Sequence, residues 1–349
     1  MLKRKSTLAG IALLAGAALG LTACGGSPSA SSSSAGAGAS GDGITVYNAQ
    51  HEALTKSWAD EFTKETGIKV TLRNGEDPEL ANQIIQEGAA SPADVFLTEN
   101  SPSMTQVENA GLFADIDKDT QDQVPAAYRP STNKWTGIAA RSTVLVYNKD
   151  KVKESELPKS LMDLSQDQYK GKWAASPSGA DFQAIVSAML ELKGEQATSD
   201  WLKAMKNNSK AYKGNSTAMK AVNAGEVDMA VIYHYYYFGD QAKTGENSKN
   251  IGMHYFKNQD PGAFVSVSGG GVLKSSKHAA EAQQFLKFIT GKKGQEVLEN
   301  GSSYEYPIAS EVPANAKLTP LKDLQAPTVD AAKLNSPKVI DLMTQAGLL

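Results

Sequence analysis

The feature that most restricts the fold is a regular alternation of strand and helix patterns over residues 44–111. Short β-prone runs lie at residues 44–47, 68–72 and 93–97, and between them apolar residues recur every three or four positions, as on one face of a helix. Gly67 and Gly111 stand where helical patterns end. Strands that alternate with helices form a mostly parallel sheet covered by helices, so this part of the sequence predicts an α/β fold.

Strand and helix patterns continue through the rest of the 349 residues, a length that accommodates two domains or one large one. Two β-rich pieces are expected within residues 135–147. A strand over residues 264–273 contains Gly269–Gly271, which predicts a close backbone crossing or a bend. Further helices are predicted at about 180–193, 196–207, 216–225, 279–290, 293–298 and 339–346.

Residues 1–23 have the pattern of a secretion signal. Met1–Lys5 is basic, and the apolar stretch over residues 8–21 is short for a membrane-spanning helix. It ends in Leu21-Thr22-Ala23-Cys24, which resembles the lipobox of bacterial lipoproteins. The resemblance implies cleavage before Cys24 and lipidation of its thiol, whereas the alternative is an ordinary signal with an incidental cysteine. Cys24 is the only cysteine, so the chain forms no internal disulfide.

The signal is followed by a tract composed almost entirely of Gly, Ser and Ala, which cannot bury a core. We therefore assign residues 24–42 to the lipidated cysteine and a flexible tether. The mature protein is expected outside the cytoplasm, anchored to the cell membrane by lipidated Cys24.

Charge and motifs exclude several classes of function. The net charge is -3, and removal of residues 1–23, which carry three basic and no acidic side chains, leaves -6. A mildly acidic chain argues against nucleic acid as a partner. Four histidines are present, but no dinucleotide-binding, P-loop, nucleophile-elbow or HExxH pattern accompanies them. The sequence therefore predicts a protein that is not an enzyme, and a secreted hydrolase is the least favoured alternative.

An aromatic run is the strongest local signal for a site. Tyr233–Tyr237 contains four phenols and one imidazole, and it directly follows the buried-strand pattern of Met229–Ile232. Strand ends in α/β sheets are where binding sites form. Phenol oxygens suit a hard, highly charged metal ion. Aromatic runs are more often part of a core, so this run alone leaves both interpretations open.

Segments spread along the chain resemble the bacterial ferric-ion-binding proteins, the receptors of iron(III) ABC importers. These segments are Ile44–Glu52, Thr66–Val70, Pro92–Glu99, Tyr235-Tyr236, Asp260–Ala263 and Val272–Ser276. The resemblance implies a two-lobed periplasmic-binding-protein-like (type II) fold with a ligand cleft between the lobes. Lobe 1 is expected to contain residues 43–141 and about 265–315, and lobe 2 residues 142–264 and about 316–349, with hinges near Ala140–Ser142 and Phe264–Val267.

The same resemblance implies that Fe(III) is held by His51, Glu99, Tyr235 and Tyr236 together with a synergistic anion, namely phosphate, carbonate or citrate. Three anionic oxygens and one neutral nitrogen offset the 3+ charge of a hard ion. A free phenol has a pKa of about 10, so binding displaces protons and weakens as the pH falls. Taken singly, His51 is better explained as a helix-start histidine with a local hydrogen bond, and Glu99 as a solvated or capping carboxylate.

The positions expected to bind the anion are Arg141, Ser178, Gly179, Ala180 and Asn215. Ser178–Ala180 opens a predicted helix, whose free N–H groups favour an anion. Asn100 stands where the family commonly has Gln, and Tyr233-His234 replaces a polar Asn pair. These departures leave the identity of the anion open. Reserve candidates for the site are Tyr233, Tyr237, His234, Glu52 and Arg73.

Together these expectations predict an extracytoplasmic Fe(III) receptor that delivers iron to an ABC permease and its ATPase. The resemblance implies a monomer that contacts the membrane only through its lipid anchor. The alternative keeps the fold but changes the ligand to an organic cation or a phosphorylated small molecule, such as a polyamine, thiamine or a phosphonate. An aromatic cluster holds an organic cation by cation–π contact.

Overall fold

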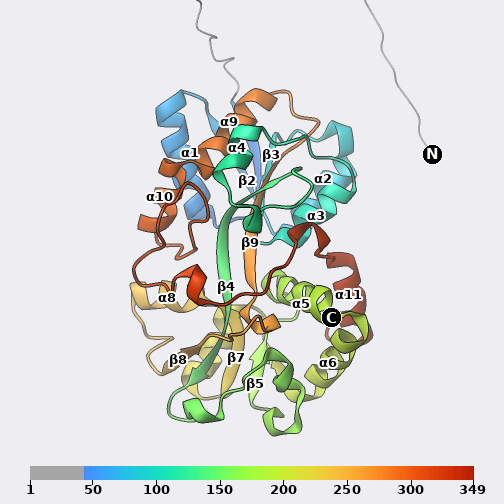
Figure 1. Ribbon diagram of the computed structural model, residues 1–349, viewed down its shortest axis with the longest axis vertical. Helices are drawn as coiled ribbons and strands as arrows, with labels where there is room; N and C mark the ends of the chain where they lie inside the picture. The colour runs from blue at the N-terminus through green and yellow to red at the C-terminus, as the bar shows by residue number, and fades with distance from the viewer. Residues whose placement is uncertain (1–42) are drawn as a thin grey trace, which may run out of the picture. The chain divides into compact units, whose positions relative to one another are not determined.

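The computed structural model describes residues 43–349 (Figure 1). The predicted signal, lipidated cysteine and tether lie outside these residues. Within them, nine strands form one mixed sheet with the order β2-β1-β3-β9-β4-β7-β5-β6, and β8 also pairs with β4. None of the helices in this part of the chain is long and apolar enough to cross a membrane.

The predicted alternation at the beginning of the folded chain is confirmed. Strand β1 pairs in parallel with both β2 and β3. Helix α1 ends at Gly67, which has the left-handed φ of 76° that glycine adopts without strain. The elements are β1 (Ile44–Asn48), α1 (Glu52–Thr66), β2 (Val70–Asn74), α2 (Asp77–Glu87), β3 (Val95–Leu97), α3 (Ser101–Asn109) and α4 (Lys118–Gln123).

Two antiparallel strands, β4 (Thr136–Asn148) and β9 (Val265–Val272), connect the two halves of the sheet (Figure 1). The prediction of two separate β pieces in the β4 region was wrong, because all 13 residues form one buried strand. Strand β4 pairs with β9 up to Ser142, and from Thr143 onward it pairs with β7. This change of partner falls at the predicted hinge.

The second half of the sheet contains β5 (Trp173–Ala175), β6 (Ser209–Ala211), β7 (Met229–Tyr233) and β8 (Ile251–His254). Strand β5 is parallel to β6 and β7, whereas β7 and β8 are antiparallel to β4. The helices of this half are α5 (Ala180–Lys193), α6 (Glu195–Asn208), α7 (Asn215–Ala224) and α8 (His234–Lys243).

The chain then returns to each half in turn. Helices α9 (Ala279–Thr290) and α10 (Lys292–Asn300) pack beside α1, and the rings of Phe62 and Phe285 lie 5.1 Å apart (Figure 1). Helix α11 (Ser336–Gln345) packs on α5 and α6. Short 3-10 turns occupy Gly88–Ala90, Ala126–Tyr128, Glu154–Glu156, Leu161–Ser165, Asp167–Tyr169, Pro261–Ala263, Leu321–Asp323 and Ala331–Lys333.

The backbone at Gly269–Gly271 is closely approached, but by side chains and not by a crossing backbone segment. A Cβ atom at Gly269 would stand 2.3 Å from the side chain of Met104, and one at Gly271 would stand 2.6 Å from Phe113. Side chains from the covering elements therefore pack directly on the backbone of β9.

Candidate metal centre

The aromatic run lies at the junction between β7 and α8. Strand β7 ends at Tyr233 and α8 begins at His234, so Tyr235 and Tyr236 occupy the first turn of a helix. Their rings lie 4.3 Å apart, and both hydroxyls donate to Asp181 Oδ2, at 3.1 and 3.0 Å. The chain leaves strand geometry at this point because a helix begins at His234.

His51 and Glu99 join these phenols from the other half of the sheet. His51 is the residue before α1, and Glu99 follows β3. His51 Nδ1 lies 3.2 Å from Glu99 Oε1, and the His51 ring centroid lies 4.9 Å from that of Tyr235. The structure thus brings His51, Glu99, Tyr235 and Tyr236 into one cluster assembled from three separate parts of the chain.

The cluster requires its phenols in order to hold a metal ion. Among residues 43–349, no three His, Cys, Asp or Glu side chains are arranged to hold a metal ion by themselves. The donor set formed with the tyrosines is rich in oxygen and contains no sulfur, which is the chemistry that a hard cation prefers.

Burial shifts the proton affinities of the whole cluster. It raises the pKa values of Tyr235 and Tyr236 well above the usual value of a phenol, and the negative charges of Asp181 and Glu99 raise them further. Burial and Asp181 likewise raise the pKa of Glu99, whereas burial lowers the pKa of His51. Without a cation, the two phenols and the Glu99 carboxyl group therefore favour their protonated forms, and the His51 imidazole favours its neutral form. A bound cation favours the deprotonated form of the phenols and of Glu99.

Arg141 is buried beside this cluster, with its Cζ atom 5.8 Å from the centre of the Tyr235 ring. Its Nη2 donates to Glu305 Oε2 at 2.6 Å. Burial opposes the charge of Arg141, but Glu305 and Glu99 raise its pKa, so the guanidinium remains charged. Its Nε and Nη1 find no hydrogen-bond partner in the described part of the chain. Such unpaired donors favour an anion or water.

The other predicted anion residues lie around the beginning of α5. Gly179 immediately precedes the helix, Ala180 is its first residue, and Ser178 is exposed just before it. Asn215 is buried, and its Nδ2 donates to Asp181 Oδ2 at 2.8 Å. The predicted helix start is therefore present.

Two buried carboxylates were missed in the sequence. Asp181 follows the predicted anion segment and accepts hydrogen bonds from Tyr235, Tyr236 and Asn215, and also from Asn100 Nδ2 at 2.9 Å. An acidic residue in the first turn of the expected anion-binding helix is a signal that could have revealed it. Glu305 carries no comparable local signal, since it lies in an irregular segment.

The reserve candidates have other partners. His234 is buried, its Nδ1 accepts from the Ser142 N–H at 3.2 Å, and its Nε2 lies 2.8 Å from the Tyr304 carbonyl. Tyr233 is buried, and its hydroxyl lies 3.3 Å from Asn100 Oδ1.

The remaining reserve candidates do not join the cluster; these are Arg73, Tyr237 and Glu52. Arg73 Nη1 donates to the Tyr47 hydroxyl at 3.0 Å, and the ring of Tyr237 packs 5.4 Å from that of Phe238. Glu52 is exposed.

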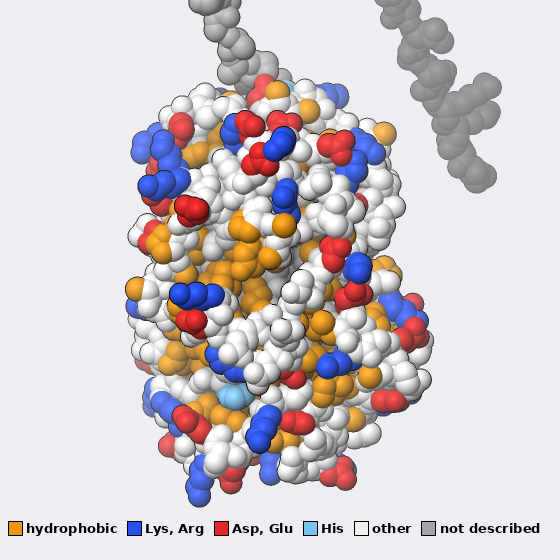
Figure 2. All heavy atoms as spheres, viewed as in Figure 1, with side chains coloured by type: hydrophobic (Ala, Val, Ile, Leu, Met, Phe, Trp, Pro, Cys, Tyr) orange, Lys and Arg blue, Asp and Glu red, His pale blue; other side chains and the backbone are white. Residues whose placement is uncertain are grey.

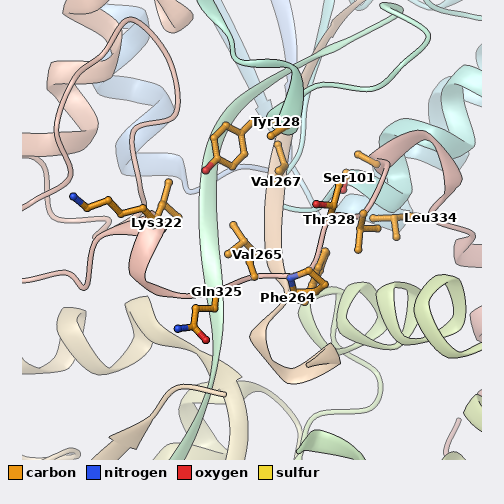
Figure 3. A pocket seen from close by; sticks show the side chains of 15 residues that line it. Ser101, Tyr128, Phe264, Val265, Val267, Lys322, Gln325, Thr328 and Leu334 are labelled. Carbon is orange, nitrogen blue, oxygen red and sulfur yellow. The ribbon is translucent and has the colours of Figure 1, made fainter. Parts of the chain in front are cut away.

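A hollow of about 620 Å³ gives access to the cluster, and it is lined by His51, Tyr235 and Tyr236 together with Lys220 and Lys243. A separate hollow of about 270 Å³ lies beside β9 and the segment over residues 321–334 (Figure 3). Its lining contains no Asp, Glu or His, so it offers little to a cation. Apolar side chains also gather near the middle of the face in Figure 2.

Comparison with known proteins agrees with this architecture. The family described as bacterial extracellular solute-binding protein matches residues 90–336. The Fe(3+)-binding periplasmic protein of Serratia marcescens is 68% identical over 307 residues, which are 88% of this chain and 91% of that protein.

Two solved structures are also similar. Iron-bound HitA from Pseudomonas aeruginosa has a TM-score of 0.82 and 42% identity, covering 87% of this chain and 99% of that one. The Trichodesmium protein IdiA (FutA), in complex with iron and citrate, has a TM-score of 0.78 and 28% identity, covering 88% of this chain and all of that one. These matches confirm the expected two-lobed α/β fold and the resemblance to ferric-ion-binding proteins. The chain therefore belongs to the family of bacterial extracellular solute-binding proteins.

Proposed function

We propose that this protein binds Fe(III) outside the cytoplasm and delivers it to an ABC permease and its ATPase. One observation carries the proposal: His51, Glu99, Tyr235 and Tyr236 converge from three parts of the chain on one cluster. The names of the Serratia protein and of iron-bound HitA, which describe ferric-ion binding in those proteins, support it. The protein acts by binding, and we assign it no catalytic reaction.

The ionic chemistry fits a trivalent cation. Deprotonated Tyr235 and Tyr236 and ionised Glu99 supply three negative oxygens, and neutral His51 supplies a nitrogen. Their charges balance that of Fe(III), and hard oxygens suit a hard ion. Binding therefore requires the loss of protons that burial holds on these groups.

We further propose that a synergistic anion (phosphate, carbonate or citrate) completes the site at Arg141, Ser178, Gly179, Ala180 and Asn215. The unpaired Nε and Nη1 of Arg141 and the start of α5 support this. The citrate present with iron in the Trichodesmium protein also supports it.

A second arrangement is favoured by Asp181. Its carboxylate already accepts from both phenols, at 3.1 and 3.0 Å. When the phenols lose their protons to bind iron, Asp181 Oδ2 is left beside the metal. In that arrangement Asp181 supplies the negative charge that an exogenous anion would otherwise bring.

We propose that iron binding closes two lobes about a hinge. Lobe 1 contains residues 43–141 and about 265–315, and lobe 2 contains residues 142–264 and about 316–349. The change of β4 partner after Ser142 supports this boundary. The packing of α9 and α10 beside α1, and of α11 on α5 and α6, supports the assignment of the later segments. The permease would recognise the closed form.

We also propose that Cys24 carries a lipid, which anchors the protein to the outer face of the cell membrane. The protein is proposed to be a monomer and to have no nucleic-acid partner. The family description supports an extracytoplasmic location. Metabolic labelling with radioactive palmitate tests the anchor. Label on the unaltered protein and none on Cys24→Ala is expected, whereas an unlabelled wild type contradicts lipidation.

The competing ligand class is an organic cation or a phosphorylated small molecule bound in the same cleft. Competition dialysis with ferric ion, spermidine, thiamine and a phosphonate distinguishes the two. Retention of ferric ion alone, in the presence of excess organic ligands, is the expected result. Retention of an organic ligand with no affinity for ferric ion would move the function to the alternative.

A further inference from the structure

Glu305 is a fully buried carboxylate that the proposed function leaves unexplained. It lies in the segment over residues 304–306, where Tyr306 pairs with Ala140 of β4. One of its oxygens, Oε2, accepts from Arg141 Nη2 at 2.6 Å and Gln50 Nε2 at 3.2 Å. This oxygen is therefore held in place by the strand at the predicted hinge and by the chain next to His51.

The other oxygen of Glu305 faces the metal cluster. Glu305 Oε1 lies 3.2 Å from His51 Nε2. Both atoms are buried, and neither completes a hydrogen bond in the described part of the chain. The His51 side chain is nevertheless 29% exposed, so its accessible part is not the atom Nε2. Nδ1 lies instead 3.2 Å from Glu99 Oε1.

The backbone before Glu305 is fixed in an unusual conformation. Tyr304 has a φ of 55°, in the left-handed region that is costly for a bulky residue. Its carbonyl lies 2.8 Å from His234 Nε2, and the other nitrogen of His234 accepts from Ser142 at the predicted hinge. These contacts maintain the strained conformation and hold the following carboxylate inside the protein.

We propose that Glu305 is a positioning residue of the metal centre: it accepts a hydrogen bond from His51 Nε2–H and thereby presents His51 Nδ1, beside Glu99, to ferric ion. The inference rests on the proposed function. A histidine that binds a metal through one nitrogen usually donates its other N–H to a carboxylate or carbonyl, which fixes the tautomer and the ring orientation. Contacts that are poorly aligned in an empty site commonly tighten when the ligand binds.

The Arg141–Glu305 pair makes this role compatible with burial. The positive guanidinium of Arg141 lies 2.6 Å from Glu305 Oε2 and offsets the charge of this buried carboxylate. Glu305 orients His51, and Arg141 compensates the negative charge that Glu305 would otherwise add to the cluster. The pair also connects His51 directly to β4 at the predicted hinge.

A double-mutant cycle on ferric-ion affinity tests this role. The variants are Glu305→Gln, His51→Ala and the double variant, with Glu61→Gln as the matched control because Glu61 is 54% exposed on α1. Glu305→Gln is expected to weaken binding by about 10–100-fold, as removal of such a partner typically does. In the His51→Ala background the same change is expected to cost almost nothing, because the group that it positions is absent. Equal losses in both backgrounds would overturn the proposal.

Thermal unfolding of each metal-free variant shows whether Glu305→Gln remains folded, since Arg141 loses its charged partner. A second measurement needs no variant at Glu305. The unaltered protein, containing histidine labelled with ¹⁵N at Nδ1 only or at Nε2 only, is loaded with ferric ion and examined by pulsed electron paramagnetic resonance. Strong coupling from Nδ1 and weak coupling from Nε2 are expected, and the reverse pattern would overturn the proposal.

Failure of the proposed function and failure of the role of Glu305 give different experimental results. If the unaltered protein binds no ferric ion, the proposed function fails and the role of Glu305 fails with it. If it binds ferric ion but the cycle is additive or Nε2 is the coupled nitrogen, only the role of Glu305 is wrong.

Discussion

The Tyr236 hydroxyl donates a hydrogen bond to Asp181 Oδ2 at 3.0 Å, across the space between the first turns of α8 and α5. In this arrangement the phenol is protonated, and burial raises its pKa well above the usual value. Ferric ion must displace that proton in order to bind the phenolate. In the proposed site, that displacement removes one of the donors to Asp181, whose carboxylate still accepts from Asn215 and Asn100.

Tyr236→Phe is expected to weaken ferric-ion binding on the order of 10²-fold or more, because loss of one partner in a buried charged contact typically costs about 2–5 kcal/mol. The change removes a single oxygen and leaves the ring in place. Competition with a colourless chelator measures the loss. Tyr237→Phe is the matched control and should bind as the unaltered protein does. Equal affinity in the two variants would remove Tyr236 from the site.

Asp181→Asn is expected to weaken binding by a similar factor, on the order of 10²-fold, because it removes the charge next to both phenols. Added phosphate should restore part of the affinity by occupying the start of α5 and pairing with Arg141. Affinity in phosphate-free and phosphate-containing buffer measures both effects. Unchanged affinity in Asp181→Asn without phosphate would show that the carboxylate is not part of the metal centre.

The affinity for ferric ion should fall as the pH falls. Both phenols are protonated in the empty site near neutral pH, because burial raises their pKa values, and both release a proton on binding. Linkage then predicts that the binding constant changes about 100-fold per pH unit from the two phenols alone. Affinity measured between pH 6 and pH 8, with correction for hydrolysis of the free ion, gives the slope. Tyr236→Phe should reduce this slope by about the one proton that Tyr236 releases on binding. An unchanged slope would contradict the assignment of Tyr236 as a ligand of ferric ion.

The location of the site could be predicted from the sequence, but its contacts could not. Local patterns identify the strands that end near Glu99 and Tyr235, since hydrophobic periodicity and glycine stops are encoded within a few residues. The start of α8 at His234 was not predicted, because an aromatic run lacks a strong helix signal. Glu305 reaches His51 through an irregular segment, so only the tertiary structure reveals it.

The fold, like the site, could be predicted from the sequence only where residues close in the chain determine the structure. The alternation over residues 44–111 predicts parallel pairing of β1 with β2 and β3, because short connections with helices permit little else. The short strands β6 and β8 were missed, since their sequences lack the apolar, β-prone run that reveals the three-residue strand β3. The continuity of β4 through Ser142 depends on its long-range partners β9 and β7, which local sequence does not encode.

The stability of the metal-free protein should fall in acid partly because of His234. Burial lowers the pKa of His234 to about 3, whereas an unfolded histidine titrates near its usual value of 6.5. The unfolded state therefore binds more protons between these two values, and stability is lost as the pH falls through that window by up to about 1.4 kcal/mol per unit. Denaturant unfolding of the unaltered protein and His234→Gln measures this. Parallel pH profiles of the two proteins would contradict it.

Optical titration of the metal-free protein with ferric ion, in the presence of phosphate or carbonate, tests the central claim most directly. Phenolate bound to ferric ion gives a visible charge-transfer band, so the account predicts a colour that saturates at one iron per chain. That colour should disappear in Tyr235→Phe and Tyr236→Phe and persist in Tyr237→Phe. A protein that remains colourless, or whose colour is unaffected by the first two changes, would contradict an iron centre built on these tyrosines.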